Sequence, residues 1–278
     1  MEITEIIKEA FIFPSQNLEK LAIYIVLTFV LGLLAILGVF TIILGVNDGS
    51  FYFILTFILS FIGIVVSLII TGYLVGVLKS GIDHDESAPG LDWKNDFITG
   101  LKMLVVTIVY FIIPAIVAWI MAFVTNIPGQ FLDIAQKMAI SPANATAAAN
   151  SSSTVVTGVS QAAMASLTSS IAITSLVTAV VFIIFAFLSA MGESRLANTG
   201  DLGEAINIPE AFRDITRIGV GKVIATILLV VIVIMVIQGI LGYLYGQIPY
   251  LSIIGIIVTP YLAFFSQRAV GLLYSDIA

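Results

Sequence analysis

The sequence contains no cysteine and only one histidine, His84. The absence of thiols excludes disulfide bonds, a cysteine nucleophile and cysteine-based metal sites. A lone imidazole also argues against a histidine-rich metal cage and against serine–histidine catalysis of the usual kind. We therefore predict no catalytic residues, no metal site and no cofactor.

Charged residues are scarce as well. They make up 10% of the 278 residues, while 60% are hydrophobic, and the mean hydropathy is +1.15. Soluble proteins need roughly 25% charged residues to cover their surface, so an ordinary soluble domain is excluded. The composition indicates an integral membrane protein whose partners include membrane lipids. The net charge of −6 argues against nucleic acid as a partner, because nucleic acids select basic surfaces.

Six apolar runs are long enough to cross a bilayer, which takes about 20 residues. They cover residues 21–46, 51–78, 101–125, 169–191, 223–245 and 250–273. Short turns at 47–50 and 247–249 follow the first and fifth runs, and Pro114 and Pro260 predict bends in the third and sixth. The sequence predicts an all-α polytopic membrane protein, a single membrane domain over 1–278 with six transmembrane helices in three hairpins.

Residues 1–20 lack the basic start and short apolar core of a cleaved signal, so we expect them to be retained. Apolar side chains recur there at helical spacing. They are Ile3, Ile6, Ile7, Ala10 and Phe11. This pattern predicts an amphipathic helix that lies in the membrane interface and stops before Pro14.

Basic residues predict the orientation of the chain. With the N-terminus inside, ten lysines and arginines are cytoplasmic and only Lys137 is outside. The cytoplasmic ones are Lys8, Lys20, Lys79, Lys94, Lys102, Arg195, Arg213, Arg217, Lys222 and Arg268. The positive-inside rule then predicts a multi-pass cell-membrane protein with both termini cytoplasmic, cytoplasmic loops at 79–100 and 192–222, and an extracellular loop at 126–168.

The extracellular loop contains two triplets of the N-glycosylation pattern, at Asn144 and Asn150. Glycosylation and chance occurrence in an Asn/Ser/Thr-rich stretch both remain open. Residues 127–140 predict a helix resting on the outer leaflet. Residues 159–170 are expected to extend the fourth span above the membrane.

The chain reads as three copies of one unit: an interfacial segment, a basic residue, a span outward, a turn and a span back. The copies start with EAFIFPSQNLEK, GLDWKNDFITGLK and PEAFRDITRIGVGK, and each reaches a lysine (Lys20, Lys102 and Lys222) where the membrane begins. All three start from the same side, so the internal repeat is expected to be parallel.

The stretch GYLVGVLKSGIDHDESAPGLDWKNDFITGLKMLVV resembles a hallmark segment of an archaeal, uncharacterised family of integral membrane proteins, the domain of unknown function 4013. The matching features are Gly72-Tyr73, the acidic loop Asp83–Trp93 and Gly100-Leu101-Lys102. The later segments SRLANTGDLGEAI and EAFRDITRIG resemble the second loop of that family. The resemblance implies a multi-pass archaeal protein over nearly the whole chain except the low-complexity outer loop, with a distant relation to membrane domains of bacterial glycerophosphodiesterases. It implies no activity.

Few residues are candidates for a site. Gly72-xxx-Gly76 and Gly242-xxx-Gly246 predict close helix packing, either between subunits or within one chain. Asp83-His84-Asp85-Glu86 can be read as a divalent-cation site or as a solvated acidic turn. A lipid head-group contact is predicted for the basic residues Arg213, Arg217 and Lys222.

No Asp, Glu, Lys, Arg or His lies in the middle of any span, which disfavours ion-coupled transport, and the common enzyme motifs are missing. We expect a non-enzymatic protein with a structural, self-assembling or membrane-organising role, as a homo-oligomer or with other membrane proteins. One alternative is a passive channel or carrier for a small or lipidic solute. A weaker one is a lipid head-group enzyme, which would have to use cytoplasmic carboxylates. These are Asp92, Asp96, Glu193 and Glu210.

Overall fold

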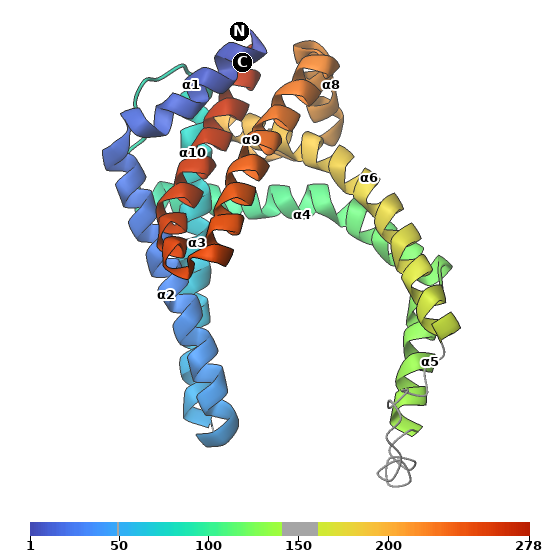
Figure 1. The fold of residues 1–278 in the computed structure, drawn as a ribbon. Helices are drawn as coiled ribbons and strands as arrows, with labels where there is room; N and C mark the ends of the chain where they lie inside the picture. Colours follow the sequence, from blue (N-terminus) through green and yellow to red (C-terminus); the bar gives the residue numbers. More distant parts are fainter. Residues whose placement is uncertain (49, 141–160) are drawn as a thin grey trace. The chain divides into compact units, whose positions relative to one another are not determined.

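Helices make up almost all of the chain that can be described. A computed structural model describes residues 1–48, 50–140 and 161–278. The elements are α1 (Ile3–Gln16), α2 (Leu18–Asp48), α3 (Ser50–Ile82), α4 (Trp93–Val124), α5 (Ile127–Ile140), α6 (Gln161–Thr199), α7 (Leu202–Ala205), α8 (Ile208–Ile218), α9 (Val220–Gln247), the 3-10 helix η3 (Pro249–Ile254) and α10 (Gly255–Tyr274) (Figure 1). The all-α class is confirmed. The predicted glycosylation sites Asn144 and Asn150 lie outside the described residues.

Within the described ranges, six helical segments are long and apolar enough to cross a membrane. They are α2, α3, α4, α6, α9 and the segment formed by η3 with α10. Many of their large apolar side chains remain exposed, as expected for helices that face lipid. The longest, α6, has 39 residues and so measures about 58 Å, well beyond the hydrocarbon core of about 30 Å. The chain is a multi-pass membrane protein.

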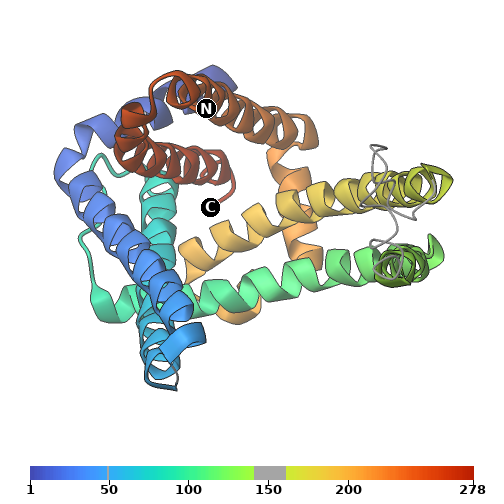
Figure 2. The same cartoon turned by 60° about the horizontal axis from the view of Figure 1, so that its bottom comes forward.

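The contacts divide the chain into two compact units, residues 1–108 with 187–278, and residues 109–186. In the first unit, α2 and α3 form a hairpin (Figure 2), and α10 packs against both α3 and α1. Figure 1 shows α1 and α10 side by side, and the N-terminal ammonium of Met1 lies 3.2 Å from the carboxylate of Asp276. The first and last helices therefore belong to the same packed body.

Several helices run further than the sequence predicted. The helix α1 continues through Pro14 to Gln16, so the predicted stop before Pro14 is wrong. A proline three residues from the helix end removes only one backbone hydrogen bond, and the burial of Phe13 and Pro14 offsets that loss. Both predicted loops are also partly helical: only residues 83–92 separate α3 from α4, and α7 and α8 lie within 192–222.

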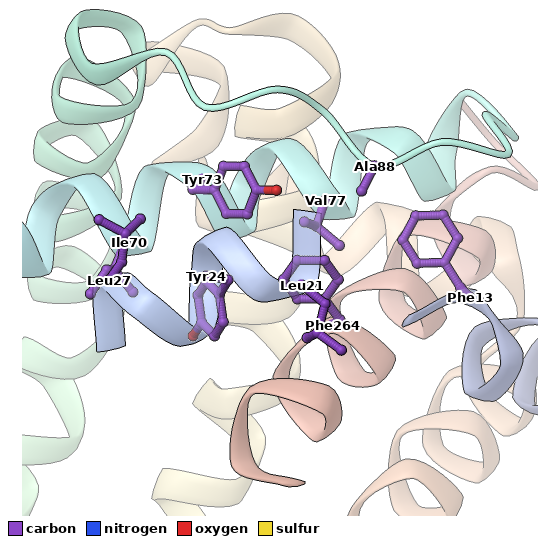
Figure 3. Close-up of a cluster of buried hydrophobic side chains, with 9 residues drawn as sticks. All are labelled: Phe13, Leu21, Tyr24, Leu27, Ile70, Tyr73, Val77, Ala88 and Phe264. Carbon is purple, nitrogen blue, oxygen red and sulfur yellow. The ribbon is translucent and has the colours of Figure 1, made fainter. Parts of the chain in front are cut away.

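An apolar cluster holds α2, α3 and α10 together near α1 (Figure 3). Its buried members are Phe13, Leu21, Tyr24, Leu27, Ile70, Tyr73, Val77, Ala88 and Phe264. The rings of Tyr24 and Phe264 meet edge to face at 5.3 Å, and the ring of Tyr73 lies 6.0 Å from that of Phe264. Because Ala88 is also a member, the cluster fixes the loop 83–92 as well as the helices.

Glycines allow two close helix crossings in the first unit. A Cβ atom at Gly72 would lie 1.8 Å from the carbonyl oxygen of Asp96, and one at Gly100 would lie 1.8 Å from that of Leu68. The backbones of α3 and α4 therefore touch where only glycine fits. At the crossing of α3 and α10, a Cβ atom at Gly271 would similarly lie 2.1 Å from the carbonyl oxygen of Leu78.

The second unit contains the end of α4, α5 and the start of α6. The hydroxyls of Thr125 and Thr174 lie 2.9 Å apart, and the side chain of Gln130 donates to the hydroxyl of Ser170 at 2.9 Å. These polar contacts join the two long helices near the start of α5. A helix is present at 127–140, as predicted, and α6 begins at Gln161, before the predicted start of the fourth span at residue 169.

Candidate functional site

The first unit contains a set of charged residues between its helices, which we call the charged layer: the buried Arg195, Asp214 and Arg268, and the half-exposed Glu9. Arg268 is only 2% exposed. Its guanidinium donates to the backbone carbonyls of Ser80 and Asp85, both at 2.6 Å, and to the Glu9 carboxylate at 2.7 Å. It also lies over the ring of Phe13, 4.3 Å from the centroid. This one side chain joins α10 to α3, to the loop 83–92 and to α1.

Asn17 fastens the same loop from the other side. This buried residue occupies the single position between α1 and α2. Its amide nitrogen donates to the carbonyls of Phe13 at 3.0 Å and Glu86 at 3.1 Å, and its oxygen accepts from the N–H of Ala88 at 2.7 Å. Asn17 binds only backbone groups of the loop, the carbonyl of Glu86 and the N–H of Ala88. The contact therefore holds the loop in position without engaging any of its side chains.

The second part of the charged layer joins α6, α8 and α10. Asp214 is 1% exposed and accepts from Arg195 at 2.8 Å and from the hydroxyl of Tyr274 at 3.2 Å. Arg195 also donates to the carbonyl of Glu204 at 3.0 Å and pairs with its carboxylate. Arg217 reaches Asp214 at 3.4 Å. This buried carboxylate therefore links three helices through the donors of Arg195 and Tyr274.

An ion cluster joins the two ends of the first unit. The Asp276 carboxylate pairs with the ammonium of Lys222 and with the N-terminal ammonium of Met1, the latter at 3.2 Å. Burial alone would raise the pKa of the Asp276 carboxyl, but the hydrogen bonds and charges of Lys222 and the N-terminus outweigh it and hold the pKa below its ordinary value.

The predicted glycine pairs have different surroundings. Gly72 lies on the backbone of α4, and a Cβ atom at Gly76 would lie 3.1 Å from the ring of Pro89. These two glycines therefore pack within the chain. No atom lies within 4 Å of a Cβ atom placed at Gly242 or Gly246, so the close packing predicted for that pair is not made within the described parts of the chain.

The three basic residues predicted to contact a lipid head group have different surroundings. Arg213 and Arg217 have side chains that are 64% and 60% exposed, and they pair with Glu210 and Asp214 on their own helix. Lys222 is instead engaged with Asp276. Only the two arginines present their charge to the surroundings.

The acidic loop Asp83-His84-Asp85-Glu86 is exposed, and His84 has a backbone φ of 56°. Across the described ranges, no three His, Asp or Glu side chains are placed to hold a metal ion. The loop contributes instead through its backbone, because the carbonyl of Asp85 binds Arg268 and that of Glu86 binds Asn17.

The carboxylates considered for catalysis have local partners. Asp92 and Asp96 cap the start of α4, where the N–H of Asp92 donates to Asp96 at 2.8 Å and the N–H of Asn95 donates to Asp92 at 3.1 Å. Glu193 accepts from the amide of Gln267 at 3.1 Å, and Glu210 pairs with Arg213. The geometry thus shows helix caps and interhelical contacts at these positions.

Comparison of the sequence with models of protein families identifies the family of this chain. The chain matches the family model described as Protein of unknown function (DUF4013) over residues 55–246. It belongs to the DUF4013 family. The predicted resemblance is confirmed, with a narrower range at both ends than expected and with the outer loop included. No curated protein and no solved structure matches the chain.

The matched range cuts through the charged layer of this DUF4013 protein. Arg195 and Asp214 lie inside it, while Glu9, Asn17 and Arg268 lie outside. The archaeal origin and the relation to glycerophosphodiesterase membrane domains stay predictions, because the family description addresses neither.

Sequence reasoning did not identify Asn17, Asp214 or the buried role of Arg268. Asn17 precedes the first apolar run and Arg268 lies near the end of the sixth, so both are polar residues at the edge of an apolar run, whereas Asp214 lies within the predicted loop 192–222 and gives no such signal. The structure buries all three residues.

Proposed function

We propose that this protein is a non-enzymatic structural component of the membrane that self-assembles or organises the surrounding bilayer. The observation that carries this proposal is the burial of Arg268. Its two terminal nitrogens donate hydrogen bonds to backbone carbonyls and to Glu9. The guanidinium therefore stabilises the packing of helices, and these nitrogens are not available to a ligand.

The other charged groups of the first unit support the same role. Asp214 is enclosed by Arg195 and Tyr274, and the middle of every apolar run lacks Asp, Glu, Lys, Arg and His. Transport of ions and acid–base catalysis both need an ionisable group that can reach a substrate. A helix scaffold needs only that its buried charges be paired, as Arg195 is with Asp214 and Arg268 is with Glu9.

Self-assembly and orientation are parts of this proposal. Gly242 and Gly246 leave open space beside α9, and small residues on a lipid-facing helix allow another helix to approach closely. We also propose that both termini and the segments 83–92 and 200–207 face the cytoplasm, which the distribution of lysine and arginine supports.

The test uses the purified full-length protein. Its mass is measured under native conditions in detergent, and the protein is then reconstituted in liposomes that are imaged by electron microscopy. We expect a homo-oligomer or a change in liposome shape relative to protein-free liposomes. A strict monomer that leaves liposome shape unchanged would overturn the proposal.

A groove between α2 and α3 favours a second candidate, a passive carrier of a lipidic solute. The groove has a volume of about 470 Å³. It is lined mainly by apolar and small residues: Leu31, Leu34, Ala35, Gly38, Val39, Ile42, Thr56, Leu59, Ser60, Gly63, Ile64, Ser67, Leu68 and Leu104. Replacing Gly63 by Leu fills the groove, so a carrier would lose transfer of a labelled lipid between vesicles. Unchanged transfer in that variant would remove this candidate.

A further inference from the structure

The helix α8 (Ile208–Ile218) has two chemically different faces. It starts at Asn207, whose side chain accepts from the N–H of Glu210 at 3.3 Å, and it ends at Gly219 with φ of 105°. Its inner face is buried through Ala211, Asp214 and Ile215, and Asp214 anchors it to Arg195. The helix is therefore held in one orientation by the charged layer.

The outer face of α8 combines an aromatic ring with two cations. Phe212 is 60% exposed, and the side chains of Arg213 and Arg217 also lie outside the buried face of the helix. Positions four residues apart on a helix place their Cβ atoms about 6 Å apart on one face. Two guanidinium groups at this spacing can hold one phosphate between them.

The two arginines retain free hydrogen-bonding capacity. Asp214 is bound mainly by Arg195 at 2.8 Å, so its contact with Arg217 at 3.4 Å is secondary. Arg213 forms an ion pair with Glu210 through only one of its two terminal nitrogens. A guanidinium has five N–H donors, so both side chains can donate to a further acceptor.

The position of α8 in the chain identifies the acceptor. Only Gly219 separates α8 from α9, which is a candidate membrane span from Val220 onward. The last turn of α8 is therefore followed directly by a segment long and apolar enough to enter the bilayer, and lipid phosphates lie at the boundary where such a segment begins. An exposed phenylalanine beside arginines is typical of a helix lying at that interface.

We propose that the outer face of α8, formed by Phe212, Arg213 and Arg217, binds the phosphate head group of an anionic phospholipid. Phe212 enters the acyl boundary while the arginines hold the phosphate. Lys222 is not part of this site, because Asp276 occupies it. The contact deepens the proposed membrane-organising role, on which its physiological meaning rests.

Lipid retention tests this site directly. The full-length protein is reconstituted in nanodiscs of phosphatidylcholine with one-fifth phosphatidylglycerol, extracted in mild detergent, and its bound lipids are counted by native mass spectrometry. One basic residue near an anionic surface changes affinity about fivefold. We expect Arg213→Gln/Arg217→Gln to lower phosphatidylglycerol retention at least about tenfold, with Arg213→Lys/Arg217→Lys retaining much of it.

The matched control removes the same charge elsewhere. Lys8 and Lys79 are exposed lysines of the same unit, and Lys8→Gln/Lys79→Gln is expected to retain phosphatidylglycerol as the unmodified protein does. Equal loss in both double variants would overturn the proposal, because it would reflect net charge alone. Unchanged phosphatidylglycerol retention in the Arg213→Gln/Arg217→Gln variant would also overturn it. The same holds if that variant loses a co-purifying acidic protein but keeps its lipid. Liposome imaging reports the structural role separately, so either idea can fail alone.

Discussion

The side-chain oxygen of Asn17 accepts a hydrogen bond from the backbone N–H of Ala88, 2.7 Å away and 71 residues further along the chain. The amide nitrogen of Asn17 binds the carbonyl of Glu86 at 3.1 Å. One amide thus pairs with the backbone on both sides of Ser87. Its removal would leave buried backbone groups of the loop 83–92 without a partner.

We predict that Asn17→Ala destabilises the protein by about 2 kcal/mol, since an unpaired buried backbone group costs about 1–3 kcal/mol. The apparent unfolding temperature in detergent measures the effect, and proteolysis within residues 83–92 should become faster. Asn198→Ala is the control, because Asn198 is exposed. Equal unfolding temperatures for the two variants would show that Asn17 does not fasten the loop.

Arg268→Met should destabilise the protein by about 3 kcal/mol, because the buried carbonyl of Ser80 and the partly buried carbonyl of Asp85 lose their shared donor. Arg217→Met removes an equally large side chain from an exposed position and should change stability by less than about 0.5 kcal/mol. Thermal unfolding of both variants in the same detergent makes the comparison. A small effect at Arg268 would contradict its assigned role in packing.

Two glycine substitutions should give opposite results. In Gly72→Ala the new Cβ atom would lie 1.8 Å from the carbonyl oxygen of Asp96, so α3 and α4 must separate, at a cost of at least about 3 kcal/mol. In Gly242→Ala nothing lies within 4 Å, so the higher helix propensity of alanine should give up to about 1 kcal/mol of stabilisation in the monomer. Unfolding in detergent measures both, and a harmless Gly72→Ala would refute the close crossing.

The Asp276 cluster should show a defined pH dependence. Because the pKa of this carboxyl is lowered in the folded state, its stabilising effect is present above the unfolded pKa of about 3.9 and is lost as the pH falls through the lower folded pKa. Asp276→Asn should therefore be less stable than the unmodified protein at pH 7. The difference should shrink below about pH 4, and a difference that persists at pH 2 would exclude this ion cluster as its source.

The sequence was sufficient to predict the helices but not their partners. Backbone groups in lipid must bond within a helix, so apolar length alone places the spans. The termination at Pro14 was mispredicted because propensity rules treat a proline locally, whereas Phe13 and Pro14 are buried by tertiary packing. Burial by a distant helix leaves no local pattern.

The charged layer shows the same limit. Arg268 lies 259 residues from its partner Glu9, and nothing near either residue indicates the other. Arg213, Arg217 and Lys222 were predicted together as basic residues that contact a lipid head group. The ion pair between Lys222 and Asp276 could not be predicted from the sequence, because it depends on where α10 ends in space.

The placement of Arg268 also bears on how the protein is made. During synthesis, α1, α2 and α3 leave the ribosome long before α10. The carbonyls of Ser80 and Asp85 therefore lack the Arg268 donor until the last span has been made. The first unit can close only after translation is almost finished, because its contacts join the two extremes of the sequence. Truncation shortly before Arg268 should therefore leave inserted helices that quality-control proteases recognise as unassembled.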